Sequence, residues 1–142
     1  MTQKASNSFV LFPLGKKRFA LPAGQVTELA RPDRLHSFTH TTWLQAGVLV
    51  RRGNIVPVCD VAQVLIGPSA PSRRFYLIAT RCFDGVLEST AIPVSGECEL
   101  VRTDMIPPTG KLPGYVSGLL PLAMEIVEVL DLDLLAAGEE AR

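Results

Sequence analysis

Two histidines, His36 and His40, have the spacing that metal sites use. Residues four apart lie on one face of a helix, where two imidazoles could hold the same metal ion. The HSFTH segment lacks the adjacent glutamate of an HExxH motif, and the proline-rich and threonine-rich stretches around it are poor helix formers. The sequence therefore predicts loop histidines and no metal site.

Sulfur chemistry is the next candidate, because the chain has three cysteines, Cys59, Cys82 and Cys98. They are widely spaced among apolar neighbours, form no CxxC pair, and lack a histidine or basic neighbour that would lower a thiol pKa. An odd number of such cysteines is typical of buried, reduced thiols in a cytosolic protein. Neither a disulfide framework nor a catalytic thiolate is expected.

The acidic residues Glu97, Glu99 and Asp104 are the remaining candidates for acid–base chemistry. The spacing of two between the glutamates places both on the outward face of a strand, which favours solvated surface. The glycines occur singly in turns, with neither a GxGxxG motif nor a phosphate-binding loop, so no nucleotide cofactor is indicated. These absences favour a binding module, without catalytic residues or cofactor, over an enzyme.

Composition narrows the class of partner. The 142 residues include 14 basic and 14 acidic side chains, so no net field attracts nucleic acid or an anionic membrane. Aromatic residues make up only 6% and do not alternate with basic ones, as a base-stacking surface would require. The apolar run LLPLAMEIVEVL contains two glutamates and is too short to span a bilayer. We expect a soluble, cytoplasmic protein that does not insert into membranes.

The elements that would carry a binding surface are short. Apolar runs recur every ten or so residues with Gly, Asn or Asp turns between them, which predicts a barrel or sandwich of short antiparallel strands. The hairpin GVLVRRGNIVPVCDV, residues 47–61, is unusual among them. Gly53 and Asn54 suffice for its turn, so Arg51 and Arg52 either decorate a solvated tip or belong to a binding surface.

The chain also repeats itself around a loop at residues 67–73. Shifting residues 20–65 by 71 positions makes 12 of 46 pairs identical, where average residue usage gives about three. The matches include Glu28 with Glu99, Gly47 with Gly118, and Asp60 with Asp131, the aspartates being predicted helix N-caps with Gln63 completing a capping box. The sequence predicts two copies of one small β-barrel.

The repeat acts as an internal control on the charged hairpin. The segment Arg51-Arg52-Gly53-Asn54 falls opposite Leu122-Ala123-Met124-Glu125, so the second copy makes the same connection without an arginine. The barrel therefore does not require the two arginines, whereas Glu28 recurs as Glu99 and could be structural.

Three segments of this sequence resemble the CheW-like adapter domain of bacterial chemotaxis systems: residues 9–29, 47–65 and 115–135. The middle segment carries the most specific motif, which in the family is a glycine, a short strand, Asn-Leu-Arg-Gly, an apolar pair, Pro, two apolar residues, Asp and Leu; this chain has Val50-Arg51 in place of Asn-Leu. The positions that match it are Gly47, Arg52, Gly53, Ile55, Val56, Pro57, Val58 and Asp60.

The resemblance implies a single domain over 8–137, with halves at about 9–66 and 74–136, that folds as two intertwined small SH3-like β-barrels with short helices. It further implies a non-enzymatic adapter that joins methyl-accepting chemoreceptor tips to the regulatory domain of a CheA-type histidine kinase. Arg52 with Gly53, and Val26 and Glu28 on an early strand, fall at the family's partner-binding positions. Arg51 stands where the family usually has leucine. The alternatives are a divergent adapter of a pilus-linked pathway and a small barrel that binds a metabolite or an oligonucleotide.

Overall fold

The computed structural model describes residues 7–31, 36, 45–67, 75–83 and 85–135, and most of them lie in β-strands. Short helical turns, one of them at residues 132–135, connect or follow the strands. In chain order the elements are β1 (Ser8–Leu14), β2 (Lys17–Pro22), the 3-10 turn η1 (Ala23–Gln25), β3 (Val26–Ala30), β4 (Gln45–Arg51), β5 (Asn54–Cys59), α1 (Ala62–Leu65), β6 (Phe75–Phe83), β7 (Val86–Val94), β8 (Glu99–Arg102), β9 (Val116–Pro121) and β10 (Ile126–Leu130).

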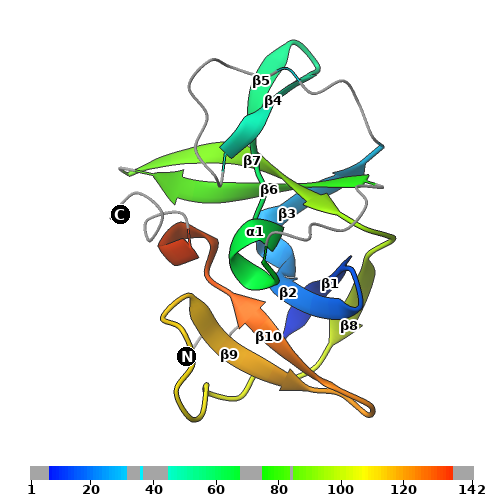
Figure 1. Ribbon diagram of the computed structural model, residues 1–142, viewed down its shortest axis with the longest axis vertical. Helices are drawn as coiled ribbons and strands as arrows, with labels where there is room; N and C mark the ends of the chain where they lie inside the picture. Colours follow the sequence, from blue (N-terminus) through cyan, green and yellow to red (C-terminus); the bar gives the residue numbers. More distant parts are fainter. Residues whose placement is uncertain (1–6, 32–35, 37–44, 68–74, 84, 136–142) are drawn as a thin grey trace, which may run out of the picture.

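The strands form two five-stranded sheets, which we call sheet A, in the order β8-β1-β2-β10-β9, and sheet B, in the order β3-β6-β7-β5-β4. The sheets lie one above the other with α1 between them (Figure 1). Sheet A combines the β1–β2 hairpin of the first half of the chain with β8, β9 and β10 of the second half. Sheet B combines the β6–β7 hairpin of the second half with β3, β4 and β5 of the first half. The predicted all-β fold of two intertwined units with short helices is confirmed, although the sheets do not close into a single barrel.

Strand register repeats residue for residue between the sheets. The parallel pair Val58↔Ala91 in sheet B corresponds to Val129↔Ala20 in sheet A, a shift of 71 positions. One difference interrupts the shift: Phe9 pairs with Pro22 whereas Tyr76 pairs with Pro93, so the β6–β7 hairpin is four residues longer than β1–β2. The internal repeat predicted from the sequence is therefore a repeat of structure.

The core has three parts because each sheet curls around its own apolar cluster before packing on the other. Leu49, Val56 and Val58 belong to the cluster of sheet B, and their counterparts Leu120, Val127 and Val129 belong to the cluster of sheet A. A larger central cluster joins the sheets and includes Phe12, Phe19, Leu77, Ile92 and Leu130. Alternate residues of each strand point into these clusters, as the period of two requires.

Of the two predicted helix N-caps, Asp60 and Asp131, one makes a side-chain cap bond that the structure shows directly. Asp131 is confirmed, since its Oδ1 accepts a hydrogen bond from the Leu134 N–H at 3.0 Å. In α1 the Gln63 N–H donates to the Asp60 carbonyl oxygen at 3.2 Å and Val61 already has helical backbone angles, so Asp60 lies at the start of this helical turn and its capping box with Gln63 stays a prediction. No helix among the described residues is long and apolar enough to cross a membrane.

Candidate functional site

The β4–β5 hairpin turns through Arg52 and Gly53. Arg51 pairs with Asn54, and the two residues between them have φ of 52° and 80°, which makes a two-residue type I′ turn. Gly53 is in the turn as expected, whereas Asn54 already lies in β5 and Arg52 takes the other turn position. Arg52 is the only non-glycine residue with positive φ in the described parts of the chain. The left-handed conformation costs such a residue about 1–2 kcal/mol, so turn formation does not account for an arginine here.

Arg51 and Glu28 form the close ion pair of this region. The Arg51 Nη2 donates to Glu28 Oε1 at 2.6 Å, whereas Arg52 Nη2 lies 3.9 Å from the same oxygen, beyond hydrogen-bond distance. The Arg51 and Glu28 side chains are 27% and 29% exposed, but the Arg52 side chain is 79% exposed. Since β3 and β4 are the two edges of sheet B, this pair joins the edges across the curled sheet.

A concavity of about 630 Å³ opens beside this ion pair. Glu28, Arg51, Arg52, Asn54, Ile55 and Ser89 contribute to its walls, and Ile55 is 68% exposed at its border. We call this concavity the open mouth of sheet B. It combines donors, carboxylates and an exposed apolar side chain within one surface.

The predicted partner-binding residues lie at or beside two neighbouring pockets. Arg52 and Glu28 both line the open mouth, although they are more than twenty residues apart in sequence, and Gly53 follows Arg52 in the turn. Val26 packs against the central cluster and lines a second pocket of about 250 Å³ together with Glu28 and Leu100, so Glu28 contributes to both pockets. A bulge between Val26 and Glu28 separates the two positions along β3.

Sequence reasoning did not identify the structural role of Arg51, which it left without a specific purpose. The structure makes Arg51 the hydrogen-bonded partner of Glu28. One clue was present, because a glutamate repeated in both halves needs a cation in each.

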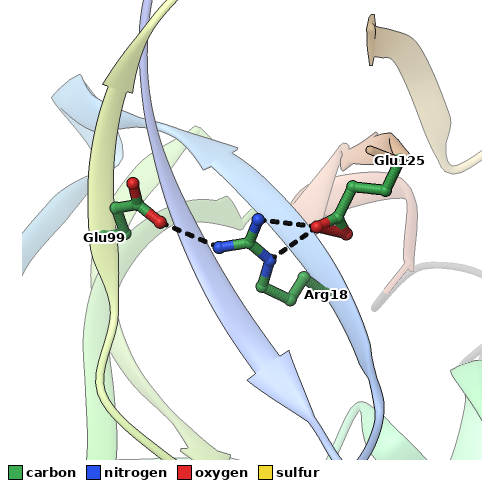
Figure 2. A network of polar contacts seen from close by, with 3 residues as sticks. All are labelled: Arg18, Glu99 and Glu125. Carbon is green, nitrogen blue, oxygen red and sulfur yellow. Dashed lines mark hydrogen bonds and ion pairs between the residues drawn. The ribbon is translucent and has the colours of Figure 1, made fainter. Parts of the chain in front are cut away.

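The equivalent place in sheet A is filled. Arg18 on β2 donates from Nη1 to Glu99 at 2.9 Å, and from Nη2 and Nε to one oxygen of Glu125 at 2.6 and 3.0 Å (Figure 2). These hydrogen bonds raise the pKa of Arg18 above its usual value. Ser89 occupies the position that corresponds to Arg18 in sheet B. We call the Arg18 network the filled mouth of sheet A.

Other candidate chemistry does not assemble in the described residues. No three His, Cys, Asp or Glu residues there form a group that could hold a metal, and His40 lies outside the described residues. His36 makes an exposed bridge to Val48. Burial raises the pKa of the half-buried Cys98 thiol to about 11, which disfavours the thiolate that a nucleophile needs.

Comparison with known proteins gives a family and a fold. The family model for the CheW-like domain matches residues 8–140. A search of curated proteins found no match. The crystal structure of the scaffolding protein TtCheW from Thermoanaerobacter tengcongensis is similar with a TM-score of 0.79, at 20% identity over 92% of each chain, and at this identity the likeness establishes the fold alone. Because the family model spans nearly the whole chain and the fold agrees, this protein belongs to the CheW-like family.

Proposed function

We propose that residues 8–137 act as one non-enzymatic adapter domain, which couples the cytoplasmic tips of chemoreceptors to the regulatory domain of a CheA-type histidine kinase. Membership of the CheW-like family supports this function. The observation that carries it is the open mouth, where Arg52 is held in an unfavourable backbone conformation with a 79% exposed side chain. Strain that the fold does not need is typical of a functional position.

The chemistry of this surface suits protein binding. The planar guanidinium of Arg52 offers several donors in a fixed geometry, and the exposed Ile55 can exclude water from a contact beside it. Gly53 permits the turn that presents Arg52, and Glu28 holds Arg51 from the opposite edge of the sheet. Val26, in the neighbouring pocket, is a second contact position in this proposal.

The experiment measures binding of the purified chain to the kinase regulatory domain and to the receptor cytoplasmic fragment. We expect a Kd of about 1 μM or tighter for at least one of them, and a loss of about ten-fold or more for Arg52→Glu. Arg102→Glu is the matched control, because Arg102 is an exposed arginine on β8 of the other sheet. If the wild-type chain binds neither partner, the adapter function is wrong.

A further inference from the structure

The two halves each place an arginine beside the same repeated glutamate, but the arginine comes from a different strand in each half. Glu28 and Glu99 are equivalent, and each accepts a hydrogen bond from one arginine. The arginine comes from β2 in sheet A, as Arg18, and from β4 in sheet B, as Arg51. The counterparts of these two arginines are Ser89 and Leu122, neither of which is charged. Arg52 is therefore a cation of the open mouth that has no counterpart in the filled mouth.

Arg51 determines what Arg52 can bind. At 2.6 Å Arg51 makes a charge-assisted hydrogen bond to Glu28, whereas Arg52 at 3.9 Å makes none to that oxygen. Without Arg51, Arg52 would be the nearest cation to Glu28, and the carboxylate would attract its guanidinium back to the protein surface. With Arg51 in place, the Arg52 donors are exposed to whatever approaches the mouth.

Ser89 supplies the space for a ligand group. In sheet A the long side chain of Arg18 lies between Glu99 and Glu125 (Figure 2). The short side chain at position 89 leaves the corresponding space in sheet B open, and this space is part of the concavity of about 630 Å³. A single side chain from another protein is much smaller than this volume.

Resting on the proposed adapter function, we propose that Arg51 keeps Glu28 neutralised so that Arg52 binds an acidic side chain, which the partner protein inserts beside Ile55 into the open mouth. Charge complementarity favours this occupant, since a carboxylate suits the donors of the exposed Arg52 guanidinium and an apolar group suits the 68% exposed Ile55 beside it. Arg51 is a positioning residue here, because it acts on the partner through Glu28 and Arg52.

A double-mutant cycle tests the role of Arg51 by calorimetric titration with the partner that binds the wild-type chain. We expect Arg51→Leu to weaken binding about ten-fold, because Arg52 then pairs with Glu28. Adding Glu28→Gln to Arg51→Leu should restore the Kd to within about two-fold of wild type, since the Glu28 carboxylate then no longer competes for Arg52. Thermal unfolding confirms that each variant is folded. Unchanged binding by Arg51→Leu, or no restoration in the double variant, overturns the inference.

A second pair of variants tests whether the partner enters the space that Ser89 leaves in the open mouth. Ser89→Arg places the equivalent of Arg18 in the open mouth and should weaken partner binding more than about ten-fold with no loss of thermal stability. Leu87→Arg adds an arginine at an exposed position of β7 that does not line the mouth, and should bind as the wild type does. Normal binding by a folded Ser89→Arg variant shows that the partner does not enter the mouth.

The acidic group is identified by charge exchange. Each exposed Asp or Glu of the partner is changed to Lys and tested against Arg52→Glu, and one of these changes should restore binding that Arg52→Glu has lost. If none restores it, the partner contact is not acidic. The proposed adapter function fails separately, when the wild-type chain binds neither the kinase domain nor the receptor fragment.

Discussion

The filled mouth of sheet A and the open mouth of sheet B are built from equivalent strands in equivalent register, yet they differ in chemistry. Arg18 joins Glu99 and Glu125 in the first, whereas Ser89 leaves space and two arginines on the hairpin flank Glu28 in the second. Because the backbone pairing is constant, the difference depends on a few side chains. A repeated fold can thus keep one copy as structure while the other changes its surface.

The hairpins of the two mouths differ in backbone as well. In sheet A the Leu122 N–H donates to the Glu125 carbonyl at 2.9 Å, and neither residue between them has positive φ. In sheet B the turn residues Arg52 and Gly53 are both left-handed. Two equivalent strands can therefore be connected without strain, which supports a functional rather than a structural reason for the Arg52 conformation.

The largest expected effect breaks the sheet that holds the filled mouth. A Cβ at Gly118 in β9 would collide with the Met105 side chain and lie 2.9 Å from the Ile106 carbonyl oxygen. Gly118→Ala should lower the free energy of unfolding by about 2–3 kcal/mol, since the clash includes backbone. Urea denaturation measures the loss. A variant as stable as wild type would show that residues 105–106 pack less tightly on β9 than described.

Removing the arginine of the filled mouth has the next largest effect. Arg18→Ala leaves Glu99 and Glu125 without this donor and should cost about 1.5 kcal/mol, the energy of charged hydrogen bonds reduced for a one-third exposed side chain. Lys17→Ala is the control, because its 3.5 Å contact to Glu128 and its position 5.0 Å from the Phe19 ring centroid are more exposed and should together contribute less than about 1 kcal/mol. Equal losses for the two variants would contradict a specific role for the Arg18 network.

A pH-dependent difference comes from the next pair of equivalent positions, Cys98 and Thr27. Burial raises the pKa of Cys98 from 9.0 to about 11, so between these values the unfolded thiol loses its proton while the folded thiol keeps it. Stability should therefore fall as the pH rises from 9 to 11, by about 1 kcal/mol after allowance for partial exposure. Cys98→Thr should remove this part of the pH dependence, as the difference between wild-type and variant urea curves shows.

The smallest expected effect is an increase in stability. Arg52→Asn makes an Asn-Gly type I′ turn, which suits positive φ better, and should stabilise the chain by about 0.5 kcal/mol. The same variant should bind the partner more weakly. A loss of stability would mean that Arg52 contributes to the fold through its side chain, and thermal unfolding at matched salt decides this.

The sequence predicted much of the fold because the repeat keeps its identities at paired positions. Val58 and Val129, for example, occupy the same place in the two parallel pairs. The exchange of strands between the halves entered only through the family resemblance, since a repeat identifies equivalent residues without specifying which strands pair. The shift of 71 positions also fails before β2, because the β6–β7 hairpin is longer.

The candidate site was predicted less completely. Arg52, Gly53 and Glu28 were identified, and the structure brings Arg52 and Glu28 together at the open mouth. The ion pair between Arg51 and Glu28 was not, because it depends on how sheet B curls to bring its edges into contact. Arg18 lies just before the aligned window of residues 20–65, so its correspondence with Ser89 was also missed.

The exchange of strands has a consequence for synthesis of the chain on the ribosome. Sheet B contains no strand beyond β7, whereas sheet A needs β10 between β2 and β9. Roughly 100 residues separate β2 from β10, and at typical elongation rates they emerge over about 5–20 s. During that time the nascent β1–β2 hairpin exposes an unpaired edge that invites aggregation. Sheet B can thus fold during synthesis, whereas sheet A depends on β9 and β10, which are synthesised after every strand of sheet B.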